Sequence, residues 1–418
     1  MPLNNRRRYV VLGVLAFTLT TVYGIWYSYG VIMVALLREF GWSRSVLAGA
    51  FSVFTLAHGL ANPLIGWLCG RMEPPRLVIA GGLLLAASLC ADSFVAVPWH
   101  LYLAFGVCTA FGVAASGWVP ALVQVQRHFP DRLGLALGIV SSGVGLGMLL
   151  VVPMCQLLID AFGWRTAFRC LGLLCLAWII PSATYLLRAS PVTARADPRL
   201  NRETPPLVHA AAPGGQGAPM TLARAARTLP FWLIIAAFLF GNVCAQTLHV
   251  HQVVYLVDHG IAAIVAATVV SVVGAASIVA KIFGGWISDL IGREVVYVVG
   301  IAIMIGAVFA LVAVGASPSA WGAYGYAVLL GAGYSVTASV IPAMASDRFS
   351  GPHFGAIVGI GLLASAVGSA LGPWLAGWLF DRTGSYAVPL AITVVCGVVA
   401  GGAGWMLRKL RLRARRPE

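Results

Sequence analysis

Residues 261–288 read IAAIVAATVVSVVGAASIVAKIFGGWIS, an apolar stretch that is long enough to cross a bilayer and contains one charged residue, Lys281. A charge near the middle of a lipid-spanning helix costs about 2.5–3.5 kcal/mol, so such residues mark places that face protein and serve a function. Small and polar residues recur around Lys281 at spacings of three and four, which places them on one helix face: Ser271, Gly274, Ser277, Gly284 or Gly285, and Ser288. We expect this face to look into a helix bundle; the alternative is a lysine that snorkels to the membrane interface.

The rest of the chain has the same apolar character. Of its 418 residues, 60% are hydrophobic and 10% are charged, and the mean hydropathy is +0.91. Twelve apolar runs predict membrane-spanning helices at 9–37, 46–69, 77–97, 101–126, 133–158, 166–187, 230–257, 261–288, 295–315, 321–346, 354–380 and 386–407. The alternating segments of about ten residues that build a transmembrane barrel are absent from the sequence. We therefore predict an all-α membrane protein that lies in a lipid bilayer.

One connection differs from the short polar turns between the other runs. Residues 188–229 are rich in proline, glycine, alanine and arginine, a composition that is typical of a flexible linker. The linker divides the chain into an N-terminal six-helix bundle at 1–187 and a C-terminal six-helix bundle at 230–407. A basic tail follows at 408–418.

The two halves carry the same landmarks. Gly66-Trp67 recurs as Gly285-Trp286, and Asp160…Gly163 recurs as Asp381…Gly384, each about 220 residues later. Six-helix repeats joined by a linker are one known way to build a transporter. The repeat predicts two bundles related by pseudo-two-fold symmetry, with a substrate site at the midplane between them.

The positive charge of the chain reports its topology. The formal net charge is +14, but the arginines gather in short clusters between apolar runs, which excludes a groove for nucleic acid. Most of these clusters lie on the side that holds both termini and the linker, so we expect that side to be cytoplasmic.

The cysteines give no sign of a metal or of catalysis. All eight lie in apolar runs, and none forms a C-x-x-C pair with metal-ligand spacing. The sequence also contains no recognisable set of nucleophile, base and acid. We expect no metal, no cofactor and no enzymatic activity.

Residues 285–293, GWISDLIGR, resemble the loop signature G-x-x-x-D-x-x-G-R of the major facilitator superfamily. The first-half copy at 66–71, GWLCGR, departs from the signature because Gly70 stands where the acid belongs. The resemblance implies the major facilitator fold, in which two bundles rock about a central site. It also implies a part in gating and conformational change for four residues of these loops: Asp289, Arg293, Gly285 and Arg71.

Five further stretches are similar, in this order, to the monocarboxylate transporter family, including bacterial members, and more distantly to the oxalate/formate exchanger. They are YSYGV (27–31), EFGWSR (39–44), RHFPDR (127–132), HQVVYLVDHG (251–260) and GWLFDRTGS (377–385). The resemblance implies a secondary active transporter of small organic anions, monocarboxylates such as lactate or pyruvate, working by alternating access. It places the protein in a plasma membrane, here a bacterial inner membrane, and we expect a monomer. Symport with protons is common in the family and stays open here.

The family pattern also implies a substrate site. Its substrate-pairing cation is usually an arginine, and Lys281 holds that place; lysine is a point charge, whereas arginine grips a carboxylate with a planar fork. The acid that animal members carry one turn before the cation is Ser277 here, and their lysine in the first span is Met33, so the sequence lacks both residues of that proton-coupling route. The family pattern adds three residues to the site: Trp118, His251 and Tyr334. From the aromatic residues of the first span we also assign Tyr29 to it.

His249 and His251 form an H-x-H motif. Residues two apart on a helix point in different directions, so we do not expect the two rings to share a metal.

Three other functions compete with anion transport. An exporter of drugs or other amphipathic molecules shares the fold, but a lone cation without a neighbouring acid disfavours cationic cargo. A membrane enzyme lacks a catalytic set in this sequence. A ligand sensor that signals through a partner docked on the linker would show ligand binding without flux.

Overall fold

The computed structural model describes residues 5–129, 133–189, 221–349 and 354–413, which form helices joined by short turns and contain no strand. Within these residues twelve helical segments are long and apolar enough to cross a membrane, as predicted. The first half contains α1 (Asn5–Phe40), α2 (Arg44–Cys69), α3 (Pro74–Asp92), α4 (Pro98–Leu101), the π-helix η1 (Tyr102–Thr109), α5 (Ala110–Ser116), α6 (Trp118–His128), α7 (Leu133–Phe162) and α8 (Trp164–Ala189). The second half contains α9 (Leu222–Ala225), α10 (Leu229–Asp258), α11 (Ala263–Ile291), α12 (Arg293–Ala316), α13 (Ala320–Phe349), α14 (Phe354–Thr383) and α15 (Ala387–Arg413).

The fourth membrane segment is not one regular helix. Residues 98–128 run through α4, η1, α5 and α6, and the helix breaks at Gly117, whose φ and ψ are −95° and −134°. A π-helical turn widens the backbone spiral and is common at functional positions. The break makes Trp118 the first residue of α6.

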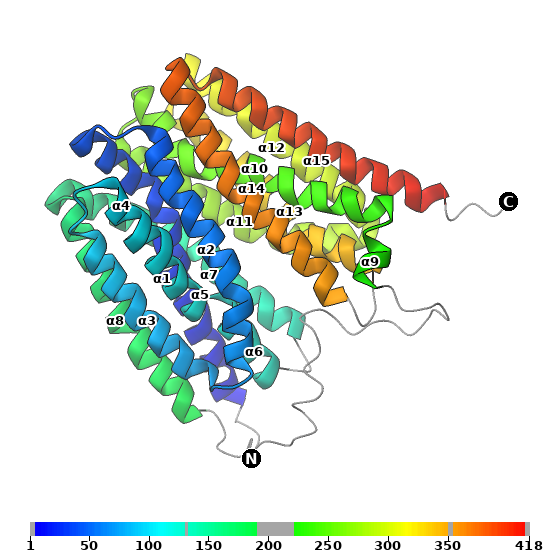
Figure 1. Cartoon of the computed structure of the whole chain (residues 1–418), viewed down its shortest axis with the longest axis horizontal. Helices are drawn as coiled ribbons and strands as arrows, with labels where there is room; N and C mark the ends of the chain where they lie inside the picture. Colours follow the sequence, from blue (N-terminus) through cyan, green and yellow to red (C-terminus); the bar gives the residue numbers. More distant parts are fainter. Residues whose placement is uncertain (1–4, 130–132, 190–220, 350–353, 414–418) are drawn as a thin grey trace.

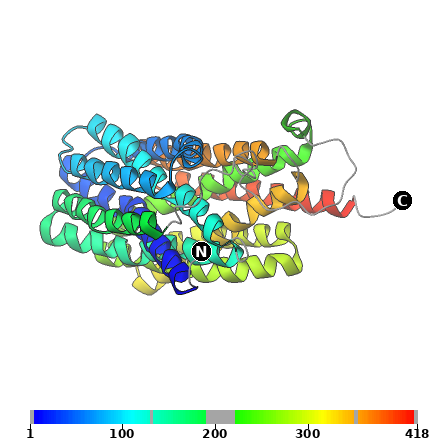
Figure 2. The same cartoon turned by 90° about the horizontal axis from the view of Figure 1, so that it is seen from below.

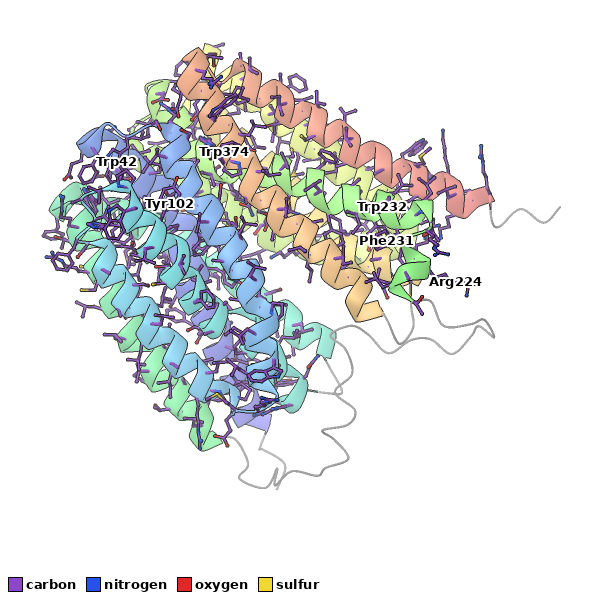
Figure 3. All side chains as sticks on the ribbon, in the orientation of Figure 1. Trp42, Tyr102, Arg224, Phe231, Trp232 and Trp374 are labelled. Carbon is purple, nitrogen blue, oxygen red and sulfur yellow. The ribbon has the colours of Figure 1, made fainter. Side chains whose placement is uncertain are left out.

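The helices gather into two bundles, α1–α8 and α10–α15 (Figure 1). Figure 2 shows the same two groups side by side from below. Seen in Figure 3, Trp42 and Tyr102 lie at one end of the molecule, and Arg224, Phe231 and Trp232 lie at the other. We name the end that carries α9 and the last turn of α15 the linker face, and the other end the opposite face.

The predicted repeat is visible in the backbone. Gly163 follows α7 and Gly384 follows α14, with φ values of 78° and 66°. Glycine takes this left-handed conformation without a steric penalty and therefore ends a helix sharply. Each glycine lies at the opposite face, at the end of the fifth membrane segment of its bundle, so the landmarks found in the sequence hold equivalent places.

Two predicted segments fall partly outside the described residues. Most of the linker at 188–229 belongs to residues 190–220, and the tail at 408–418 ends in residues 414–418. Residues 408–413 of the tail continue α15 as helix. Arg411 explains this extension, because its side chain binds Glu294 at the start of α12.

Small residues let helices approach closely, both within and between the bundles. A side chain at Gly147 would overlap the backbone of α1, so the glycine-rich run 143–147 serves close helix packing. A side chain at Gly274 of α11 would overlap Gly145 of α7, and one at Gly377 of α14 would overlap Arg44 of α2. The bundles therefore meet along two seams, α7 with α11 and α2 with α14.

Candidate functional site

Lys281 lies on the part of α11 that faces the seam between the bundles. On this helix Ile278 contacts Gly145 of α7, whereas Gly284 contacts Val336 of α13. At 100° per residue, Lys281 points between these two contacts, as the stripe of small residues predicted. Its side chain is half-buried, and within the described part of the chain it has no carboxylate partner.

Tyr334 of α13 lies at the depth of Lys281. Gly331 of α13 lies against Ser277 of α11, which precedes Lys281. Val336 of α13 lies against Gly284 of α11, which follows Lys281. Helices α11 and α13 run in the same direction, so these two contacts bracket Lys281 and Tyr334 at one level of the bundle. The structure therefore places three of the residues named in the sequence analysis, Lys281, Ser277 and Tyr334, within one helical turn of the same level. The Ser277 hydroxyl donates to the Gly274 carbonyl at 2.8 Å.

Tyr334 belongs to a cluster that joins the two bundles, which we name the central cluster: Tyr27 of α1, His249 of α10 and Tyr334. The hydroxyl groups of Tyr27 and Tyr334 are 3.3 Å apart, and the His249 ring lies 5.4 Å from the Tyr27 ring and 4.7 Å from the Tyr334 ring. His249 Nδ1 lies 2.8 Å from the Ala245 carbonyl, which only accepts, so Nδ1 carries a proton. His249 Nε2 is buried and has no partner among the described residues, so it can bind a small polar molecule.

Aromatic residues of the first bundle continue from the central cluster. The Trp26 ring stacks on Tyr23 with ring centroids 5.7 Å apart and meets His58 edge-on at 4.8 Å. Its Nε1 is buried and has no partner in the part of the chain that the structure describes. Tyr23 also reaches the break at Gly117, next to Trp118. Trp118 itself packs into a cluster of the first bundle, and the described contacts do not join it to Lys281.

The structure places Tyr29 inside the first bundle. Its hydroxyl donates to the Leu47 carbonyl, and its ring stacks on Phe105 of η1 at 4.4 Å. From α1, the Tyr27 side chain reaches the second bundle through its hydroxyl contact with Tyr334. Residues two apart point to different sides of a helix, and the sequence does not say which side of α1 meets α13.

His251 lies nearer the opposite face than His249, and the two rings have separate contacts, as expected. Both nitrogens of His251 are occupied: Nδ1 lies 2.9 Å from the Tyr386 hydroxyl, and Nε2 lies 2.9 Å from the Pro373 carbonyl. Helical periodicity alone does not favour His249 over His251 for the central cluster, and the family pattern pointed to His251.

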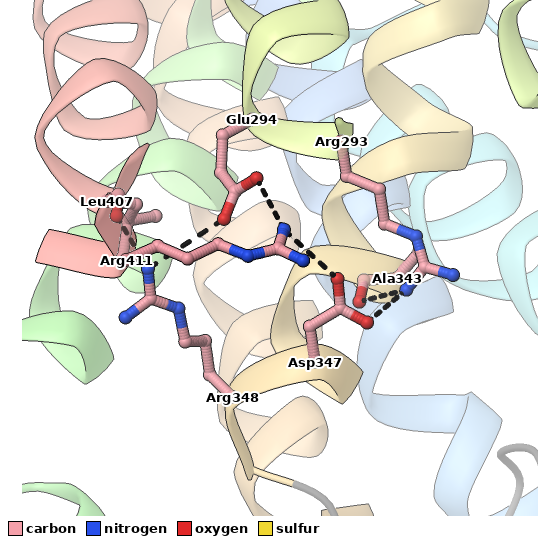
Figure 4. A network of polar contacts seen from close by, with 7 residues as sticks. All are labelled: Arg293, Glu294, Ala343, Asp347, Arg348, Leu407 and Arg411. Carbon is pink, nitrogen blue, oxygen red and sulfur yellow. Dashed lines mark hydrogen bonds and ion pairs between the residues drawn. The ribbon is translucent and has the colours of Figure 1, made fainter. Parts of the chain in front are cut away.

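The residues assigned to gating lie at the linker face. Arg293 of α12 donates to the Ala343 carbonyl at 3.0 Å and to Asp347, both on α13, so it joins helices within one bundle (Figure 4). Arg71 is exposed, and its guanidinium carbon lies 3.7 Å from the centroid of the Trp67 ring. Gly285 and Asp289 lie in α11, and the Asp289 side chain lies outside the described part of the structure.

A second group of cross-bundle contacts lies at the opposite face; we name it the opposite-face junction. It consists of Arg44 of α2 with four residues of the second bundle: Asp258, Asp381, Tyr386 and His251. The Arg44 guanidinium binds the Asp258 carboxylate and donates to the Tyr386 hydroxyl at 2.7 Å. Asp381 accepts the backbone N–H groups of Arg44 and Ser45, at 2.9 and 2.8 Å, in the first turn of α2. Asp381 therefore caps a helix of the other bundle.

Sequence reasoning did not assign the junction. Arg44 and Asp258 stand in stretches that carry the family resemblance, but nothing in the sequence pairs residues more than 200 apart. Burial raises the pKa of the Tyr386 hydroxyl above its ordinary value, so this group stays protonated and donates.

Comparisons with known proteins agree with the geometry. The profile of the Major Facilitator Superfamily matches residues 15–328 and again 253–418. Monocarboxylate transporter 13 of Bos taurus is 28% identical over 381 residues, which cover 90% of this chain and 83% of the relative. Monocarboxylate transporter 11 of Homo sapiens is 28% identical over 384 residues, which cover 89% and 76%. A bacterial homolog to the human lysosomal transporter Spinster, solved in an inward-facing and unoccupied conformation, has a TM-score of 0.71 at 18% identity and covers 99% of both chains.

Proposed function

The chain belongs to the Major Facilitator Superfamily and is a multi-pass membrane protein, and from that premise we propose that it is a secondary active transporter of small organic anions, monocarboxylates such as lactate or pyruvate. It moves them by alternating access, with the two bundles rocking about the level of Lys281. The linker face is cytoplasmic, as the clustering of arginines supports, and the membrane is a bacterial inner membrane.

Lys281 carries the proposal. A half-buried ammonium group in an apolar helix, without a carboxylate partner in the described chain, is completed by an anionic ligand. A carboxylate that binds there offsets part of the cost of holding the charge in the membrane. One cation matches one carboxylate, which favours monocarboxylates over dianions.

The central cluster supplies the rest of the site. Tyr334 lies at the depth of Lys281, and Tyr27 and His249 adjoin it. Two hydroxyl groups and a free imidazole nitrogen suit a carboxylate with an oxygen on its second carbon, as in lactate or pyruvate. Because the cluster takes residues from both bundles, a ligand bound there contacts both halves.

The junction supports an assignment of conformational state. The bundles are joined at the opposite face by Arg44 and its partners. With the linker face cytoplasmic, the conformation is closed toward the outside, which is the inward-facing state of an alternating-access cycle.

Uptake into proteoliposomes tests the proposal. We expect labelled lactate or pyruvate to accumulate, with competition by other short monocarboxylates and less by dicarboxylates. Lys281→Gln reduces uptake to background, and Lys281→Arg, which keeps the charge, retains part of it. The matched control is Lys409→Gln, because Lys409 is the other lysine of the chain and lies exposed near the end of α15. Undiminished uptake by Lys281→Gln would overturn the assignment.

Two further arms of this experiment separate the alternatives. A pH gradient, acid outside, accelerates uptake if protons move with the anion and leaves it unchanged otherwise. Competition by amphipathic dyes in place of short acids would support an exporter of drugs or similar molecules, which the partly buried indole and phenol groups near the centre also suit.

A further inference from the structure

The opposite-face junction contains a directed chain of hydrogen bonds. The Pro373 carbonyl accepts from His251 Nε2 at 2.9 Å, so Nε2 carries a proton. The Arg44 guanidinium donates to the Tyr386 oxygen at 2.7 Å, so the Tyr386 hydrogen is free to point elsewhere. His251 Nδ1 lies 2.9 Å from the same oxygen and accepts this hydrogen when the imidazole is neutral. Each donor then has one acceptor, from Arg44 through Tyr386 to His251.

A second proton on His251 breaks this order. With Nδ1 protonated, the imidazolium and the Arg44 guanidinium both donate to the Tyr386 oxygen, and the Tyr386 hydrogen loses its acceptor. Two cations then share one hydroxyl group in a site where the Arg44 side chain is 12% exposed. Repulsion in such a poorly hydrated site is strong.

The carboxylates of the junction are already engaged. Asp258 binds the Arg44 guanidinium, and both oxygens of Asp381 accept backbone N–H groups of α2. Tyr255 is a further ionisable group next to Tyr386, and the centroids of the two rings are 5.4 Å apart. The His259 ring stacks on Tyr255 with a centroid distance of 4.2 Å. Asp381 offsets part of the charge of an imidazolium at His251, but both of its oxygens already accept from α2, so no carboxylate of the described junction gives His251 Nδ1 a new acceptor.

We propose that His251 is the proton-binding member of a latch that closes the opposite face: the neutral imidazole holds the bundles together through Tyr386 and Arg44, and protonation releases them. The inference rests on the proposed alternating access but not on the identity of the substrate. Acid on the opposite face then favours the conformation that is open to that face.

A distance measurement between the bundles tests the latch without substrate. Spin labels at Ala96→Cys and Ser319→Cys report on the opposite face, because both positions are exposed in its turns, one in each bundle. The native cysteines are replaced in this background, and the protein is placed in lipid nanodiscs. Double electron–electron resonance at pH 8 and pH 5 then gives the ratio of short to long distances.

We expect the short distance to dominate at pH 8 and the ratio to fall on the order of ten-fold at pH 5, the size expected when a buried hydrogen bond to a charged group is broken. His251→Gln removes the pH response. Arg44→Gln gives long distances at both pH values. The control His100→Gln keeps the response, because His100 lies at the same face and contacts Trp99, outside the junction.

Tyr386→Phe provides a second variant if His251→Gln does not fold. It removes the oxygen that favours the neutral imidazole, so the pH response shrinks while the helices stay packed. A pH response of unchanged size in both His251→Gln and Tyr386→Phe would overturn the proposal, as would short distances in Arg44→Gln. Because no substrate is present, these outcomes are independent of whether Lys281→Gln transports.

Discussion

Glu294 should hold the linker face of the second bundle together, and its removal should cost far more stability than the removal of an exposed acid. The Glu294 side chain, on the first turn of α12, is 6% exposed. Its oxygens lie 3.0 Å from Arg411 of α15 and 3.8 Å from Arg348 of α13 (Figure 4). One carboxylate therefore ties three helices. The perturbation is Glu294→Gln, which removes the charge and keeps the shape.

The contacts set the magnitude. Removing one member of a buried ion pair costs about 3–5 kcal/mol, because the partner charge stays buried. Arg411 is 33% exposed and Arg348 19%, so water stabilises both guanidinium groups in part. Arg348 also keeps its hydrogen bond to the Leu407 carbonyl, and Arg411 lies 3.9 Å from Asp347. We therefore expect Glu294→Gln to lower the free energy of unfolding by about 2–3 kcal/mol, which is below the full penalty.

Equilibrium unfolding in mixed micelles of rising SDS content measures this difference, with tryptophan fluorescence as the readout. The matched control is Glu73→Gln. Glu73 pairs with Arg76 at 3.2 Å, but the two side chains are 52% and 66% exposed. An exposed pair of this kind is worth about 0.5 kcal/mol or less. Equal losses in the two variants, or a loss below about 0.5 kcal/mol for Glu294→Gln, would refute the reasoning.

The remaining predictions concern the seams and the central cluster. Gly147→Val places a side chain against the backbone of α1 inside one bundle, so we expect a loss of about 1–3 kcal/mol in the same unfolding assay. Gly145→Val places it against α11 of the other bundle, so uptake should fall more than stability does; the reverse order would contradict the packing. Tyr334→Phe or Tyr27→Phe removes one hydroxyl of the central pair and should raise the KM for the carried anion by up to about ten-fold, as for one lost hydrogen bond, and an unchanged KM in both would exclude the pair from the site.

The position of Lys281 is an example of what could be predicted from the sequence. Hydropathy identified the membrane segments because each one is a local property of about twenty residues. Helical periodicity then placed Lys281 and Ser277 on one face, and the structure confirms that this part of α11 lies along the seam. The repeated landmark, Asp160…Gly163 and Asp381…Gly384, likewise lies at equivalent helix ends of the two bundles.

The contacts of the histidines and tyrosines are examples of what could not be predicted from the sequence. Periodicity gives the direction of a side chain relative to its own helix, but not the helix that lies opposite. Tyr27 and Tyr29, or His249 and His251, are therefore equivalent candidates until the packing of α1 against α10 and α13 separates them.

By itself, the sequence determined the class of fold, the repeat, the apolar helix with its single lysine, and the family resemblance. The first three follow from composition and spacing along one chain, and the resemblance follows from short motifs that match a known family. Only the tertiary structure decided that Arg44 meets Asp258, Asp381 and Tyr386, and that Tyr27 meets Tyr334. Contacts between bundles depend on the angle and depth at which whole helices pack, and many helices with the same periodicity are compatible with any one partner.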